Sequence, residues 1–237
     1  MELGAGVGLC SAVAIRAGAC TRLCTTDVAE PVLELASQNL QVAAPAAASA
    51  RARSVPWSVD LLNWGDEAQI KQILAASGSR FDTVIAAEVI YPDIDVPTLR
   101  NLFKTVDMTL VQGGAFICAF VERSAPFVMR MLEVASSTGW ELALIPSTDF
   151  LPRSQSAATT RPQATEGAKL LKFTRRAAAA GCNHAVGEVG CAIFPGLKAR
   201  LQRMARAAQE AEEWVAPFAA EDELECDGAE SQGSIFS

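Results

Sequence analysis

Residues 1–8 read Met-Glu-Leu-Gly-Ala-Gly-Val-Gly and decide the fold class. Glycines occupy alternate positions from 4 to 8, and an apolar, alanine-rich segment follows them directly. In open α/β sheets, glycines that join a strand to a helix let a nucleotide lie against bare backbone. The stretch therefore predicts a nucleotide-binding turn, with an ordinary tight turn as the alternative for so short a motif.

The spacing of the glycines bears on which nucleotide is bound. A dinucleotide fingerprint needs glycine at its first, third and sixth places, and the sixth place here is Leu9. Asp27 follows about 20 residues after the glycines, at the end of the next predicted strand. A carboxylate there can accept both ribose hydroxyls of an adenosine, or it can cap the next helix. The pair predicts an adenosine-containing cofactor.

Strand and helix patterns alternate along the chain. We expect strands at the first residues and over 22–26, 55–62, 81–87, 115–121, 140–145 and 169–174. We expect helices over 9–17, 28–42, 66–76, 96–110 and 124–137, with a turn at Gly113–Gly114. Such alternation predicts an α/β fold, a doubly wound and mostly parallel seven-stranded sheet. The last two strands have no helix between them, so the last should be antiparallel.

Length and composition bound the organisation. The chain has 237 residues, half of them apolar, which suits one α/β domain with an extension. We expect a domain over 1–175 and an extension over 176–237 with one amphipathic helix and an acidic, disordered tail. The net charge of −7 disfavours a general nucleic-acid surface. No apolar run is long enough to predict a membrane span.

The cysteines and the single histidine bear on the cellular compartment, on metal binding and on hydrolase activity. Seven scattered cysteines fit reduced thiols, so we expect a cytoplasmic protein that can also be nuclear. Cys182, His184 and Cys191 have no fourth ligand at a suitable spacing, so no metal site is predicted. One histidine and no Gly-x-Ser-x-Gly motif give no support to a serine hydrolase.

Further candidate site residues follow the third and fourth predicted strands. Trp64 can pack against adenine or belong to the core, and Ala87 is small enough to leave room for a cofactor. Glu88 and Tyr91 come next, at the expected active-site edge. The alternatives for them are a loop-facing charge and a packing residue at the rim.

At this point the chain resembles a known family. It carries, in the family's order, the glycine motif, Thr-Asp at 26–27, Asn-Trp-Gly at 63–65 and Phe-Asp-Thr-Val-Ile-Ala-Ala-Glu-Val-Ile-Tyr at 81–91. That order is seen in the methyltransferase-like protein-lysine methyltransferases, which are class I, seven-β-strand enzymes. The resemblance covers residues 1–175, and the family's Asp/Glu-x-x-Tyr/Phe motif is matched by Glu88 and Tyr91.

The resemblance implies S-adenosyl-L-methionine as cofactor and a lysine-bearing protein as substrate. It places Glu88 and Tyr91 beside the incoming lysine as catalytic residues. It also implies a set of cofactor contacts, namely Gly4, Ala5, Gly6, Asp27, Trp64 and Ala87.

The chain also departs from the family. Members have a segment before the glycine motif that supplies most of the first strand, and this sequence begins at the motif. We therefore expect a truncated N-terminus and a stub in place of the first strand. Two alternatives stay open: a methyltransferase acting on a small molecule or another side chain, and an inactive relative working as a protein-interaction module. The sequence indicates no oligomeric state.

Overall fold

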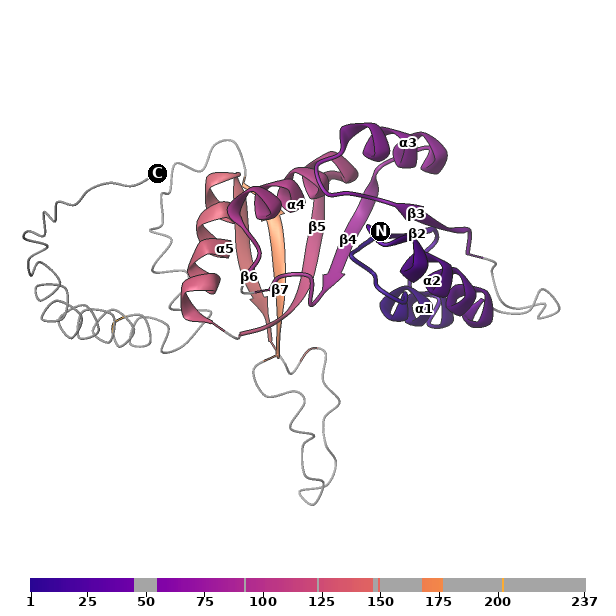
Figure 1. Cartoon of the computed structure of the whole chain (residues 1–237), viewed down its shortest axis with the longest axis horizontal. Coiled ribbons are helices and arrows are strands. Elements are labelled where there is room, and N and C mark those ends of the chain that lie inside the picture. The colour runs from indigo at the N-terminus through magenta and orange to yellow at the C-terminus, as the bar shows by residue number, and fades with distance from the viewer. Residues whose placement is uncertain are drawn as a thin grey trace, which may run out of the picture. The chain divides into compact units, whose positions relative to one another are not determined.

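The computed structural model describes most of the chain up to residue 176 (Figure 1). The described residues are 1–44, 55–91, 93–122, 124–146, 149, 168–176 and 202. The chain separates into two units, Met1–Pro195 and Gly196–Ser237. The division expected at residue 175 remains a prediction. The expected C-terminal helix and acidic tail lie, apart from Gln202, outside the described residues.

A seven-stranded sheet is the frame of the first unit, with the strand order β3-β2-β1-β4-β5-β7-β6. Its strands are β1 (Glu2–Leu3), β2 (Leu23–Asp27), β3 (Trp57–Leu61), β4 (Phe81–Ala87), β5 (Leu110–Val121), β6 (Trp140–Ile145) and β7 (Ala168–Arg175). Neighbouring strands from β3 to β5 are parallel, whereas β7 is antiparallel to both β5 and β6. The predicted mostly parallel sheet with an antiparallel last strand is confirmed.

Five helices accompany the described strands, and together they give the doubly wound pattern. They are α1 (Leu9–Arg16), α2 (Glu30–Ala43), α3 (Glu67–Ser77), α4 (Val96–Thr109) and α5 (Ala125–Ser137). Helices α1 and α2 pack on each other and contact β2, while α4 contacts β4, β5, α3 and α5 (Figure 1). Each predicted helix is present, with ends that differ by a few residues.

The start of α3 shows how the sequence sets a boundary. The Asp66 carboxylate accepts the N–H groups of Ala68 and Gln69 at 2.9 and 3.0 Å, a cap that stabilises by about 1 kcal/mol. The Gln69 side chain accepts the Asn63 N–H at 2.7 Å and so ties the loop after β3 to the helix. At α5 the corresponding Ser124 is the N-cap residue, but its side chain forms no capping hydrogen bond.

The turn expected at Gly113–Gly114 is wrong. Strand β5 runs without interruption from Leu110 to Val121, and its register with β4 shifts between Phe81 and Thr83. Gly113 has a φ of 79°, and a Cβ on Gly114 would lie 2.7 Å from the Asp82 carbonyl oxygen. The glycines therefore form an irregularity inside one strand, where the backbones approach too closely for a side chain.

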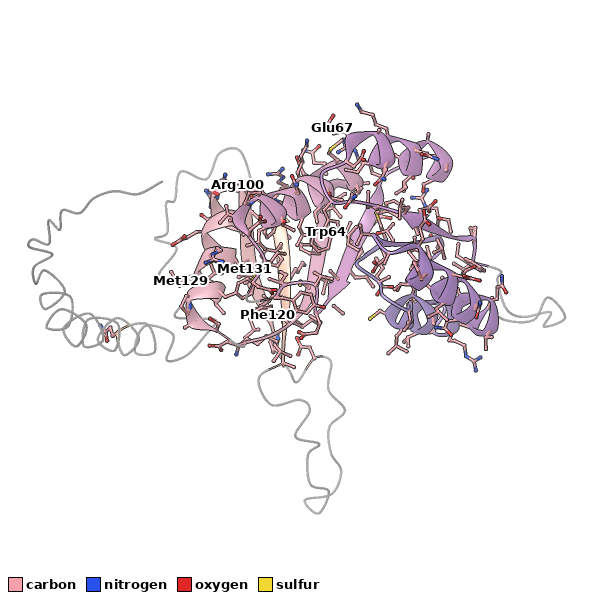
Figure 2. All side chains as sticks on the ribbon, viewed as in Figure 1. Trp64, Glu67, Arg100, Phe120, Met129 and Met131 are labelled. Carbon is pink, nitrogen blue, oxygen red and sulfur yellow. The ribbon has the colours of Figure 1, made fainter. Side chains whose placement is uncertain are left out.

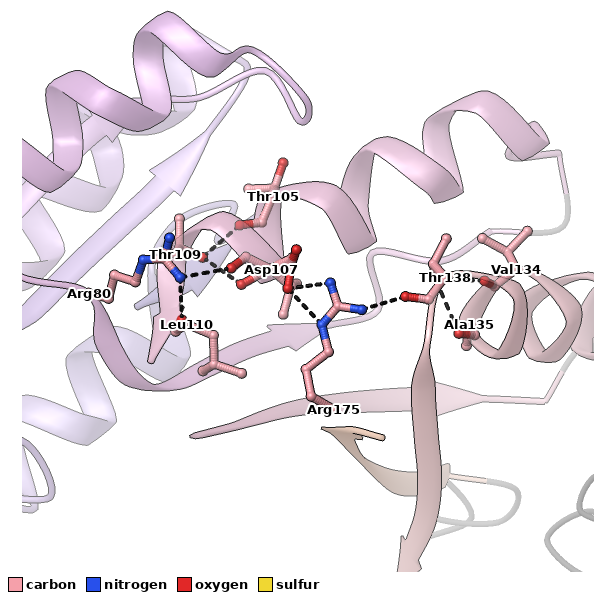
Figure 3. A network of polar contacts seen from close by, with 10 residues as sticks. Arg80, Thr105, Asp107, Thr109, Leu110, Val134, Ala135, Thr138 and Arg175 are labelled. Carbon is pink, nitrogen blue, oxygen red and sulfur yellow. Dashed lines mark hydrogen bonds and ion pairs between the residues drawn. The ribbon is translucent and has the colours of Figure 1, made fainter. Parts of the chain in front are cut away.

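An aromatic cluster holds α4 on the sheet. The Phe103 ring centroid lies 6.2, 6.1 and 5.3 Å from those of Phe116, Trp140 and Phe173. Beside it, the Arg175 Nε on β7 donates to the Asp107 carboxylate on α4 at 2.6 Å (Figure 3). These contacts fix α4 against β5 and β7, and the first turns of α4 form part of the site described next.

Candidate active site

The loop from β1 to α1 carries the alternate glycines, and all three have positive φ. The φ values of Gly4, Gly6 and Gly8 are 60°, 53° and 76°, a region that favours glycine. A Cβ on Gly4 would lie 2.6 Å from Cγ1 of Val89, whereas a Cβ on Gly6 would meet no described atom within 4 Å. Packing therefore requires glycine at position 4, while position 6 faces open space.

Asp27, the last residue of β2, holds this loop through its carboxylate. Its Oδ2 accepts the Gly6 N–H at 2.9 Å, and its Oδ1 accepts the N–H groups of Val28 and Ala29 at 2.8 and 3.1 Å. The N-cap residue of α2 is Ala29 and not Asp27. Asp27 instead accepts hydrogen bonds from the two residues that connect β2 to the helix. An ionised carboxylate has about four acceptor sites, and three are used here, so Asp27 can still accept about one hydrogen bond from a ligand.

A cavity of about 450 Å³ opens beside Asp27, at the carboxyl ends of the parallel strands. Its lining is Gly4, Asp27, Val28, Leu62, Asn63, Trp64, Val89, Tyr91, Thr98 and Asn101. Four of the predicted site residues are thus brought together here, namely Gly4, Asp27, Trp64 and Tyr91. The other four, Ala5, Gly6, Ala87 and Glu88, border the same edge of the sheet and are not among the lining residues.

Trp64 owes its position to contacts between the next residue and α4. The Gly65 N–H donates to the Thr105 hydroxyl at 2.8 Å, and a Cβ on Gly65 would lie 2.6 Å from the Asn101 side chain. Trp64, labelled in Figure 2, has its ring carbon Cζ2 3.4 Å from where a Gly4 Cβ would lie. The indole therefore reaches the glycine loop across the cavity.

Sequence reasoning missed the contribution of α4 to the cavity. Thr98 and Asn101 line it from the first turns of the helix. They stand three residues apart, so they share one helix face. In the sequence they read only as polar residues of an ordinary amphipathic helix, and no local signal separates them from solvent-facing residues.

Glu88 has the only positive φ of any described residue other than glycine, at 52°. Its N–H donates to the Ala119 carbonyl at 3.0 Å, and its Oε1 accepts the Val121 N–H at 2.8 Å. The end of β5 therefore holds both the backbone and the side chain of Glu88. Such a conformation costs of order 1 to 3 kcal/mol and is frequent at functional sites. Tyr91, which lines the cavity, is 49% exposed.

Glu2 lies under the loop and not in the cavity. Its side chain is 2% exposed, and its Oε2 accepts the Ser11 N–H at 2.9 Å and also the Ser11 hydroxyl. The Ser11 hydroxyl in turn accepts from Thr25 Oγ1 at 2.7 Å. Burial raises the pKa of Glu2, while the hydrogen bonds from Ser11 oppose the rise. These contacts make Glu2 an anchor for the start of α1 beneath the loop.

The described residues contain no cluster of three or more His, Cys, Asp or Glu side chains that could hold a metal. Cys182, His184 and Cys191 lie outside the described residues. Burial raises the pKa of both Cys24 and Cys118 to about 12, so neither is a ready nucleophile. Within the described part of the chain, no helix has the length and apolarity needed to cross a membrane.

Residues 1–131 match the sequence pattern of a family described as lysine methyltransferase, a match that spans more than half of the chain. The chain belongs to this family. The membership confirms the resemblance to class I methyltransferases, and it supports the expected S-adenosylmethionine cofactor. In this lysine methyltransferase family member, Gly4 of the glycine loop, Asp27 and Trp64 line one cavity, which is the candidate site.

Two solved structures, both of one enzyme, show the same fold. The glycopeptide N-methyltransferase MtfA, complexed with S-adenosylmethionine, has a TM-score of 0.51 at 15% identity, covering 73% of this chain and 85% of that chain. Its sinefungin complex has a TM-score of 0.51 at 14% identity with the same coverage. The methyltransferase domain of bacterial CtHen1-C has a TM-score of 0.49 at 16% identity, covering 74% and 88%. Comparison with curated proteins gave no match.

Proposed function

We propose that this chain transfers a methyl group from S-adenosylmethionine to a lysine side chain of another protein. The observation that carries the proposal is the 450 Å³ cavity in which Gly4, Asp27, Trp64 and Tyr91 meet. Family membership supports the lysine acceptor, and the MtfA complexes support the cofactor.

The cavity lining suits the chemical groups of the cofactor. Asp27 supplies its remaining acceptor site for a ribose hydroxyl, and the Trp64 indole supplies an apolar face for adenine. At Gly6 the missing side chain leaves open space in which the rest of the cofactor can approach the main chain. We assign Ala5 and Ala87, which flank the loop and end β4, to the same approach.

Glu88 and Tyr91 have the roles of substrate residues in this proposal. A lysine amine has an ordinary pKa near 10.4, so it arrives as an ammonium that the Glu88 carboxylate can hold. Tyr91 offers a ring face and a hydroxyl that orient the amine. Before reaction the lysine would lose its proton to the Glu88 carboxylate or to solvent water, which leaves a neutral, nucleophilic amine. S-adenosylmethionine, when bound, would supply the methyl group from its sulfonium and leave as the neutral thioether, so catalysis would come mainly from positioning the amine.

The remaining expectations belong to the same proposal. The partner is a lysine-bearing protein, with neither nucleic acid nor a membrane as a target, and the location is the cytoplasm with the nucleus as a second compartment. The net charge of −7 agrees with the expectation that the target is not a nucleic acid, since nucleic-acid binding relies on a basic surface.

The test is methyl transfer from radiolabelled S-adenosylmethionine to a heat-inactivated cell extract, followed by identification of the labelled residue by mass spectrometry. The proposal is supported if the natural chain places the radiolabel on lysine and the Asp27→Ala variant does not. Label on another side chain or on a small molecule contradicts the lysine acceptor. A folded chain that binds the cofactor but labels nothing favours the interaction-module alternative.

A further inference from the structure

Helix α4 brings to the cavity a side-chain amide that the proposed function does not use. Asn101 is solvent-exposed and lines the cavity together with Asp27 and Trp64. Its main-chain carbonyl accepts a hydrogen bond from the Thr105 hydroxyl, but among the described residues its side-chain amide has no hydrogen-bond partner. The amide therefore keeps both its N–H donors and its carbonyl acceptor for a ligand.

A close approach between α4 and the loop after β3 fixes the place of Asn101. A Cβ on Gly65 would lie 2.6 Å from both Cγ and Oδ1 of Asn101, so the contact requires glycine. The φ of Gly65, 88°, also favours glycine. Gly65 directly follows Trp64 in the chain. The Asn101 amide is therefore packed on the residue next to the one that the proposed function assigns to adenine.

A buried hydroxyl holds these two segments together. Thr105 is 0% exposed, and its hydroxyl accepts the Gly65 N–H at 2.8 Å while donating to the Asn101 carbonyl at 2.8 Å. Thr109, one turn further along α4, is buried to the same extent and donates to the Thr105 carbonyl at 2.8 Å. Within the part of the chain that the structure describes, the Thr109 hydroxyl bonds only to carbonyls of α4. The link from helix to loop therefore belongs to Thr105.

Adenine has hydrogen-bonding groups that match an amide. Its exocyclic amine is a donor and a neighbouring ring nitrogen is an acceptor, and one asparagine amide can bind both at once. The Asp27 carboxylate has acceptors alone, so it suits the ribose hydroxyl. Asn63 is the second amide in the lining, but no contact comparable to that of Asn101 with Gly65 holds its side chain among the described residues. A fixed amide loses less conformational freedom on binding.

We propose that Asn101 recognises the adenine of S-adenosylmethionine, an inference that rests on the proposed function, and that Thr105 is its positioning residue. The Asn101 carbonyl accepts from the adenine amine, and its N–H donates to the ring nitrogen. Thr105 holds Asn101 and the loop of Trp64 at one spacing. The site thereby distinguishes adenine from a purine that lacks the amine.

The test compares two ligands by calorimetry of the whole chain: S-adenosylhomocysteine and its analogue with hydrogen in place of the adenine amine. The natural chain should bind S-adenosylhomocysteine about tenfold more tightly, because the analogue leaves the Asn101 carbonyl unpaired. Asn101→Ala should remove this preference. Asn63→Ala, the same substitution on another lining residue, should keep it. Because Asn101 is exposed, its replacement should leave the circular dichroism spectrum unchanged.

Thr105 is tested against Thr109. Thr105→Val leaves the Gly65 N–H without its acceptor, so it should weaken S-adenosylhomocysteine binding about tenfold and reduce the preference for the amine. Thr105→Ser should restore both, and Thr109→Val should alter neither. Equal loss in Thr105→Val and Thr109→Val would overturn the positioning role.

The outcomes separate this inference from the proposed function. A chain that binds S-adenosylhomocysteine without preferring the amine, or that keeps the preference in Asn101→Ala, overturns the role of Asn101 and leaves methyl transfer to lysine standing. A chain that shows the preference and loses it in Asn101→Ala, yet labels no lysine, supports the role of Asn101 and contradicts the lysine acceptor. A folded chain that binds neither ligand overturns both.

Discussion

The two ends of β1 differ in their hydrogen bonds and in the cavity beside each. At the carboxyl end, the loop is tied to β2 by the Ala5 to Thr26 and Gly6 to Asp27 hydrogen bonds, and the 450 Å³ cavity opens above it. At the amino end, β2 and β4 stand apart around a 780 Å³ cavity closed by Arg22. Hydrogen bonds to β2 on one side and β4 on the other fix the register of Met1 to Ala5 and so place the loop.

The largest expected effect concerns the substrate residues at the carboxyl end. Glu88→Gln keeps an acceptor for the Val121 N–H but removes the charge, and Tyr91→Phe removes only a hydroxyl. We expect each to lower the rate of methyl transfer by about 100-fold, the scale of lost acid–base and orienting groups, with cofactor affinity nearly unchanged. Initial-rate assays beside calorimetry check this, with exposed Glu34→Gln as the matched control. An equal loss of cofactor affinity would contradict the assignment.

The next effect separates two glycines of one loop. In Gly4→Ala the new Cβ lies 2.6 Å from Val89 inside the folded chain, whereas in Gly6→Ala it meets no described atom and enters the space assigned to the cofactor. Gly4→Ala should therefore lower the free energy of unfolding by about 2 kcal/mol more than Gly6→Ala, the scale of overpacking, as urea denaturation can measure. Adding Val89→Ala to Gly4→Ala should restore part of the stability. Equal stabilities for the two single variants would show that the Gly4 to Val89 packing is unimportant.

A smaller effect is expected near the amino end of β1. Arg22→Met removes the guanidinium hydrogen bonds to Ser79 and Arg80 while keeping an apolar stem near Phe81. We expect a loss of about 1 to 2 kcal/mol in the free energy of unfolding, because the bonds are partly exposed. Urea denaturation measures it. Cofactor affinity should stay the same, and a parallel loss of affinity would mean that the two ends of β1 are coupled.

The smallest effect is the pH dependence from Glu2. Its pKa is raised in the folded state, so its stabilising contribution is full below the ordinary glutamate pKa of 4.5 and declines as pH rises toward the folded value. Glu2→Gln, which stays neutral and keeps an acceptor for Ser11, should flatten stability across that window. Denaturation curves between pH 4 and 8 test this, and an unchanged slope would contradict the burial argument.

Much of the fold could be predicted from the sequence because its signals are local. Strand β4 has the predicted bounds, 81–87, and the helix predicted over 66–76 is α3, Glu67–Ser77, with Asp66 as its N-cap residue. The Gly113–Gly114 pair misled because glycine favours both turns and strand irregularities. What decided between them is the contact with Asp82 on the neighbouring strand, which no local window contains.

The site could be predicted where residues lie at the end of a strand or shortly after it. Asp27 ends β2 and Trp64 lies three residues after β3, so the sheet brings both to one edge. Asn101 reaches the cavity through the packing of α4 against Gly65, and Glu88 takes its strained backbone from hydrogen bonds to β5. Both depend on contacts between segments distant in the sequence.

The measurement that tests the central claim most directly is calorimetric titration of the purified chain with S-adenosylhomocysteine, beside Asp27→Ala. The account predicts saturable binding with one site, abolished in Asp27→Ala and retained in the control Glu34→Ala. A folded chain that gives no binding heat over a range of temperatures, or that binds equally well without the Asp27 carboxylate, would contradict the cavity as the cofactor site.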